Sequence, residues 1–83
     1  MAKVTTENLN AIHIKAGRAC ISWRTKDLAE AAGLGGPLVR KFERTGQAGE
    51  KSKQAMIDAL EGAGVELLNG GRSGARLAKE NLK

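Results

Sequence analysis

Cysteine, aromatic residues and long apolar runs are scarce in this 83-residue chain, and each shortage excludes a class of protein. The single cysteine, Cys20, excludes an intrachain disulfide framework and a cysteine-rich zinc site. Trp23 and Phe42 are the only aromatic residues. A single indole is no platform on which the bases of a single-stranded nucleic acid could stack. No apolar run approaches the roughly 18 residues of a spanning helix, and no signal-peptide core is visible. We therefore expect a soluble cytoplasmic protein that binds no membrane.

Acidic residues are the minority charge. Fourteen Lys and Arg residues outnumber nine Asp and Glu residues, which gives a formal net charge of +5. The excess is concentrated between Gly36 and Lys53, whereas the stretch from Asp58 to Glu66 is acidic. Such a distribution is compatible with a positive face that binds nucleic acid, although net charge by itself is weak evidence for a partner.

Apolar residues recur at three- and four-residue steps over four segments, which predicts four short helices. In the first helix the predicted buried stripe consists of Leu9, Ile12, Ala16, Ala19, Cys20 and Trp23. Thr5 or Thr6 can cap the start of this helix. His13 lies beside the stripe and is interpreted as a boundary residue, because no second ligand stands at metal-binding spacing.

The next two helices are short and are separated by a glycine-rich turn. The second is predicted over 26–32, with Thr25 as its cap and Gly33 at its end. The third is predicted over 37–44, where a proline fits the first turn, and it buries Val39 and Phe42. Thr45 and Gly46 are expected to end it.

A fourth helix and a hairpin complete the predicted chain. The helix is expected to start at the cap Ser52 and to be closed by Gly62 and Gly64. Its inward residues are expected to be Met56, Ile57, Leu60 and Ala63. Alternation over 65–67, a turn signal at 69–71 and a second short strand at 75–77 predict a hairpin, which must dock on the helices or pair with a second copy. We therefore expect an all-α domain of four helices with a short C-terminal β-hairpin or strand.

Two stretches of the sequence are similar to a known family. The run Leu28-Ala29-Glu30-Ala31-Ala32-Gly33-Leu34, followed by Val39, Phe42 and Glu43, resembles the lambda-repressor-like helix-turn-helix domain of the Xre/Cro transcriptional regulators. The later segment 59–77, with its run Ala59-Leu60-Glu61-Gly62-Ala63-Gly64, resembles the ending of a small bacterial subgroup. The resemblance covers roughly residues 8–77. It divides the chain into an N-terminal extension (1–6), a helix-turn-helix DNA-binding domain (7–64), a strand or hairpin for dimerisation (65–77) and a flexible tail (78–83).

The resemblance also implies which residues contact DNA. The third helix would enter the major groove by its N-terminus. The implied contact residues are Arg24, Thr25, Lys26, Gly36, Pro37, Leu38, Arg40, Lys41 and Arg44. Family members usually carry polar side chains where this chain has Gly35 and Gly36, so phosphate binding is better supported than base reading. Arg18 and Glu43 match the family's ion pair between the first and third helices, for which we expect a structural role.

The leading hypothesis is a transcriptional regulator, by default a repressor, that binds double-stranded DNA as a homodimer. Its dimerisation residues are expected to be Val65, Leu67, Leu68 and Leu77. One alternative is a protein-binding module of the same fold, such as an anti-activator, antirepressor or antitoxin, with a regulatory protein as its partner. Another is a nucleoid-type protein without sequence preference. No catalytic triad, carboxylate pair or phosphate loop is apparent, so we expect no enzyme activity, no cofactor and no metal.

Overall fold

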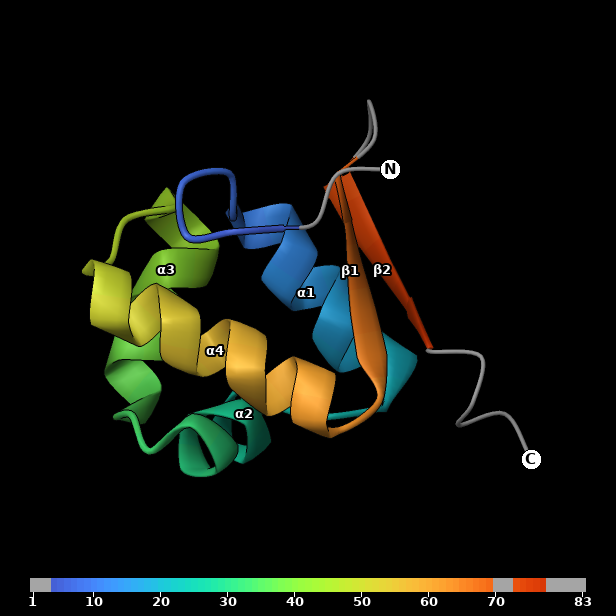
Figure 1. Cartoon of the computed structure of the whole chain (residues 1–83). Coiled ribbons are helices and arrows are strands. Elements are labelled where there is room, and N and C mark those ends of the chain that lie inside the picture. The colour runs from blue at the N-terminus through green and yellow to red at the C-terminus, as the bar shows by residue number, and fades with distance from the viewer. Residues whose placement is uncertain (1–3, 70–72, 78–83) are drawn as a thin grey trace.

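The computed structural model describes residues 4–69 and 73–77, and within these ranges the chain forms four helices followed by a two-stranded antiparallel sheet (Figure 1). The elements are α1 (Ala11–Cys20), α2 (Thr25–Ala32), α3 (Gly36–Thr45), α4 (Glu50–Gly62), β1 (Val65–Asn69) and β2 (Ser73–Leu77). The prediction of a mainly helical chain with a C-terminal hairpin is thus confirmed. Gly70 and Gly71 of the predicted turn and the predicted tail at 78–83 lie outside the described residues.

The start of α1 differs from the prediction. Asn10, not Thr5 or Thr6, caps this helix, since its Oδ1 accepts hydrogen bonds from the backbone N–H groups of Ile12 (2.9 Å) and His13 (3.2 Å). In return the backbone N–H of Asn10 donates to Nδ1 of His13 at 3.0 Å. This reciprocal arrangement is a capping box in which histidine takes the place that Glu or Gln usually fills.

Helices α2 and α4, in contrast, begin earlier in the chain than predicted. Arg24 is the N-cap residue of α2, and its backbone N–H donates to the Asp27 carboxylate at 2.9 Å, so Thr25 is the first helical residue and not the cap. Helix α4 begins after Gly49 and not at Ser52. The predicted glycine stops are confirmed: Gly33 and Gly46 have φ angles of 69° and 75°, a left-handed conformation that glycine adopts without strain.

The predicted buried stripe of the first helix is confirmed only in part. Leu9 is buried, and Cys20 and Trp23 pack against the core as partly buried residues. Ile12 and Ala19, however, are exposed.

The buried residues of α1 itself are His13, Ile14 and Gly17. Apolar spacing missed this face because two of these three residues are a histidine and a glycine, which such a pattern does not count as apolar.

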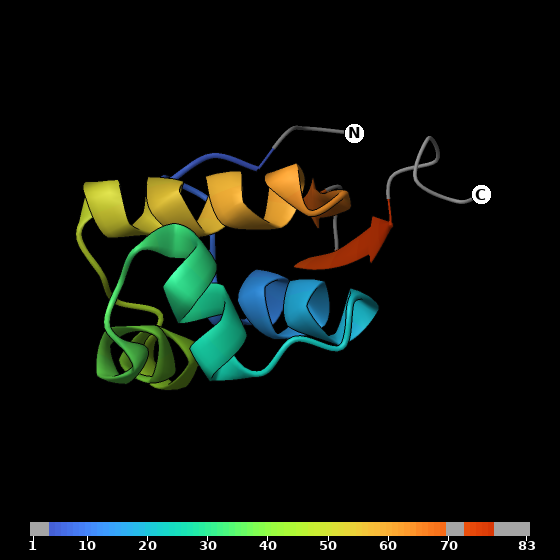
Figure 2. The same cartoon turned by 90° about the horizontal axis from the view of Figure 1, so that it is seen from below.

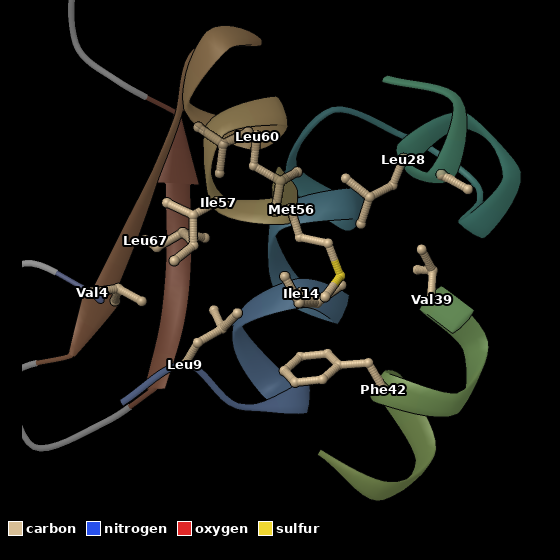
Figure 3. Packing of buried hydrophobic residues seen from close by; sticks show 12 residues of the cluster. Val4, Leu9, Ile14, Leu28, Val39, Phe42, Met56, Ile57, Leu60 and Leu67 are labelled. Atoms are coloured by element: carbon tan, nitrogen blue, oxygen red, sulfur yellow. The ribbon is translucent and has the colours of Figure 1, made fainter. Parts of the chain in front are cut away.

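The core lies between the helices and the inner face of the hairpin, with α1 packed against α3, α4 and both strands. Figure 3 shows Ile14, Phe42 and Met56 pointing toward one another near its centre. The buried hydrophobic residues are Val4, Leu9, Ile14, Leu28, Ala29, Val39, Phe42, Met56, Ile57, Leu60, Val65 and Leu67. Val4, which belongs to the predicted N-terminal extension over 1–6, is in this set at 3% exposure and packs against the domain.

The hairpin and α3 lie at opposite ends of the molecule in both views (Figures 1 and 2). In the hairpin, Val65 pairs with Leu77 and Leu67 pairs with Ala75. Val65 and Leu67 are 2% and 5% exposed and pack into the chain's own core. The expectation that these two side chains meet a second copy is therefore corrected, because alternation along β1 directs them inward. Leu68 is half-buried, and the side chain of Leu77 is outside the described structure.

Candidate nucleic-acid interface

Helix α3 separates its side chains sharply by polarity. Val39, Phe42 and Glu43 form the buried face, because positions three and four apart lie on one side of a helix. Arg40, Lys41 and Arg44 are exposed, as is Pro37 in the first turn. The exposed side of α3 is therefore basic from Arg40 to Arg44.

The only carboxylate of α3 belongs to Glu43, and it is neutralised inside the molecule. The Arg18 guanidinium from α1 donates to its two oxygens at 2.6 and 2.7 Å, through Nε and Nη2. Arg18 also donates through Nη1 to the carbonyl of Trp23 at 2.9 Å. The ion pair that the resemblance implied is thus present, with Arg18 and Glu43 side chains 20% and 10% exposed. It joins α1 to α3 and removes the negative charge from the basic side of α3.

The start of α3 offers few backbone donors to an anion. Pro37 has no N–H group, and the N–H groups of Leu38 and Val39 donate to the carbonyl of Gly35 at 3.2 and 3.4 Å. The Arg40 guanidinium reaches back over this end of the helix, where its Nη1 lies 3.3 Å from the place a Cβ atom would occupy on Gly36. A cationic side chain is therefore present beside the glycine where family members usually carry a polar side chain.

The remaining predicted contact residues belong to the start of α2 and to the first turn of α3. Arg24 and Lys26 are exposed, whereas Thr25, Gly36 and Leu38 are half-buried. Helix α2 packs against α3, and the short segment around Gly33 joins the two helices.

One cationic residue of this region, Lys15, was not among the predicted contact residues. It is exposed on α1 and, together with Arg40, Glu43 and Arg44 of α3, lines an open hollow of about 540 Å³. The signal was present, since Lys15 stands three residues before Arg18 and so lies on the same side of the helix. That this side faces α3 is decided by the packing of the two helices.

Other kinds of site find no support among the described residues. No group of three His, Cys, Asp or Glu side chains there could hold a metal ion. In the same ranges, no helix is long and apolar enough to cross a membrane. His13 is buried and serves the cap of α1 and, through Nε2, a 2.9 Å hydrogen bond to the carbonyl of Leu68.

No protein-family model matches the chain, and no curated protein matches it significantly. The function is therefore inferred from the arrangement of the side chains.

Proposed function

We propose that this protein is a small transcriptional regulator that binds duplex DNA through the exposed side of α3. One observation carries the proposal: the basic residues of α3 are all exposed, whereas its single acidic residue, Glu43, is buried and paired with Arg18. A helix with a positive outer side fits the width of the major groove and is attracted by the phosphates on both sides of it. The contact residues in the groove would be Arg40, Lys41 and Arg44. Arg24, the N-cap residue of α2, and Lys26 of α2 would contact the DNA backbone.

The fold proposed for this function is the lambda-repressor-like helix-turn-helix domain of the Xre/Cro regulators. Support comes from the order of the helices, from the packing of α2 on α3, and from the bidentate Arg18–Glu43 pair. We propose a homodimer that occludes a promoter in the cytoplasm, because a two-fold protein matches a palindromic site. Since Val65 and Leu67 are buried within the chain, any pairing through the hairpin would use the outer edge or outer face of its strands.

The proposal is tested by the affinity of the protein for the DNA upstream of its own coding sequence and for random duplexes, each at two salt concentrations. Specific regulation requires a preference that survives at the higher salt, because the electrostatic component of binding is screened there. The double variant Lys41→Ala/Arg44→Ala should lose affinity, and the slope of log affinity against log salt should become less negative by about 1.8. Unchanged affinity and slope in this variant would exclude α3 as the recognition helix.

A second candidate function is a protein-binding module of the same fold. It is favoured by the first turn of α3, where Gly36, exposed Pro37 and half-buried Leu38 present no polar side chain of their own. Leu38→Lys separates the two functions. In a protein-binding module it abolishes binding of the partner, whereas in a DNA-binding protein it retains or increases non-specific affinity for duplexes. Equal affinity of the unmodified protein for every duplex would instead favour a nucleoid-type protein.

A further inference from the structure

We propose that the hollow between α1 and α3 binds a phosphate group of the DNA backbone, and that Lys15 of α1 is one of its ligands. The proposal rests on the proposed function and extends the interface beyond the helix-turn-helix unit. The hollow is lined by Lys15, Arg40, Glu43 and Arg44 and is open to solvent.

The first argument is charge. Three cations line the hollow, and its one carboxylate, Glu43, already accepts two short hydrogen bonds from a fourth cation, Arg18. The five groups therefore carry a formal charge of +3. Among the described residues, none of Lys15, Arg40 and Arg44 forms an ion pair of its own. Like charges held close together repel, and an anion placed between them relieves that repulsion.

The second argument is geometry. The cations that line the hollow come from two helices, Lys15 from α1 and Arg40 and Arg44 from α3, so an anion in the hollow is within reach of donors from both helices. Lys and Arg side chains are the donors that proteins direct to phosphate oxygens most often. A hollow of about 540 Å³ that stays open to solvent suits a phosphate that remains attached to a polymer, because the sugar on each side must continue along the surface.

The third argument is continuity with α3. Arg40 and Arg44 line the hollow and also belong to the exposed side of the helix on which Lys41 lies. When a helix lies in the major groove, backbone phosphates flank it on both sides. The hollow runs along one flank of α3, which is where such a phosphate would be met. Lys15 would thus fix the orientation of the helix without reading bases.

The test compares Lys15→Ala with Arg76→Ala in duplex-binding titrations over a range of salt concentrations. Both variants remove one exposed positive charge, but Arg76 is on β2, at the opposite end of the molecule from α3. We expect Lys15→Ala to make the slope of log affinity against log salt less negative by about 0.9 and to weaken binding equally for all duplex sequences. Arg76→Ala should leave the slope unchanged. Lys15 is exposed, so the melting temperature should stay unchanged and separate lost contact from lost folding.

The outcomes distinguish this inference from the proposed function. If Lys15→Ala binds as the unmodified protein does while Lys41→Ala is weakened, the phosphate site is overturned and the proposed function stands. If the unmodified protein binds no duplex, both are overturned. If Lys15→Ala changes the base preference and keeps the salt slope, the assignment of Lys15 as a phosphate ligand is also overturned, because a phosphate contact carries no sequence information.

Discussion

At the scale of single residues, His13 shows how a polar side chain is accommodated in the core. Its Nδ1 accepts the backbone N–H of Asn10, so the ring proton belongs on Nε2, which donates to the carbonyl of Leu68. The neutral ring thereby satisfies one donor at the start of α1 and one acceptor on β1. A protonated ring would carry a second N–H that faces the N–H of Asn10, so the arrangement favours the neutral form.

This arrangement predicts a loss of stability in mild acid. Burial lowers the pKa of His13 below 6.5, and the hydrogen bond to Leu68 opposes that effect only in part. The unfolded chain therefore binds more protons than the folded one below pH 6.5. The contribution of His13 is complete above that pH and should decline at up to about 1.4 kcal/mol per pH unit as the pH falls toward the folded pKa. Urea unfolding between pH 7.5 and 5.5 measures it.

The control for this prediction is His13→Gln, which cannot titrate. The variant should be less stable at pH 7.5, since the ring fills the core, but its free energy of unfolding should vary less between pH 7.5 and 5.5. An identical pH dependence in both proteins would show that other groups cause the loss.

At Gly17, α1 packs closely against the core. A Cβ atom there would lie 2.9 Å from Cδ1 of Leu60 and 3.4 Å from Cδ2 of Leu67, both in the core. We expect Gly17→Ala to lower the free energy of unfolding by about 1–3 kcal/mol, because overpacking exceeds the gain in helix propensity. Gly62→Ala is the matched control. It has open space around it, and should be neutral or stabilising by up to about 1 kcal/mol in the same urea titration.

At the scale of elements, the Arg18–Glu43 pair joins two helices whose paired residues are 25 positions apart. Glu43→Gln should destabilise the protein by roughly 1–3 kcal/mol, because the Arg18 guanidinium loses its charged acceptor where the pair is largely covered. The comparison variant is Glu66→Gln, which breaks the Glu66–Arg76 pair across the hairpin. That pair is exposed, so the cost should stay below about 1 kcal/mol.

Thermal unfolding followed by circular dichroism measures both variants. Equal melting temperatures for Glu43→Gln and the unmodified protein would contradict a structural role for the pair. The sequence preference of DNA binding should be the same in both proteins, since Glu43 is buried and presents no group to a base.

The elements also show how far sequence alone reaches. Glycine at 33 and 46 predicted the ends of α2 and α3, and Val39 with Phe42 predicted the buried face of α3. These signals are local, because a left-handed turn or a helical repeat depends only on residues within one or two turns. The inward face of α1 was predicted only in part, because the pattern selected Ile12 where the structure buries Ile14. The choice between Ile12 and Ile14 depends on what α1 packs against, and that lies in α3, α4 and the hairpin.

At the scale of the whole molecule, two neighbouring residues of β1 allow folding and the proposed self-association to be tested separately. Leu67 is in the core, whereas Leu68 is half-buried on the next position of the strand. Leu67→Ala should cost about 2–4 kcal/mol of stability and lower the melting temperature. Leu68→Ala should change stability little. If the proposed homodimer pairs through the outer side of the hairpin, Leu68→Ala should shift the protein toward the monomer in sedimentation equilibrium. A dimer unaffected by Leu68→Ala would place the interface elsewhere.

The sequence by itself determined the number and order of the helices, the hairpin and the excess of positive charge in the third helix, because each depends on neighbouring residues. Only the tertiary structure decided which side chains meet. It buried Val4, Val65 and Leu67 in one core and brought Lys15 beside Arg40 and Arg44. Such contacts join residues far apart in the chain, and the helix faces that make them are selected together when the apolar surfaces of all elements are buried at once.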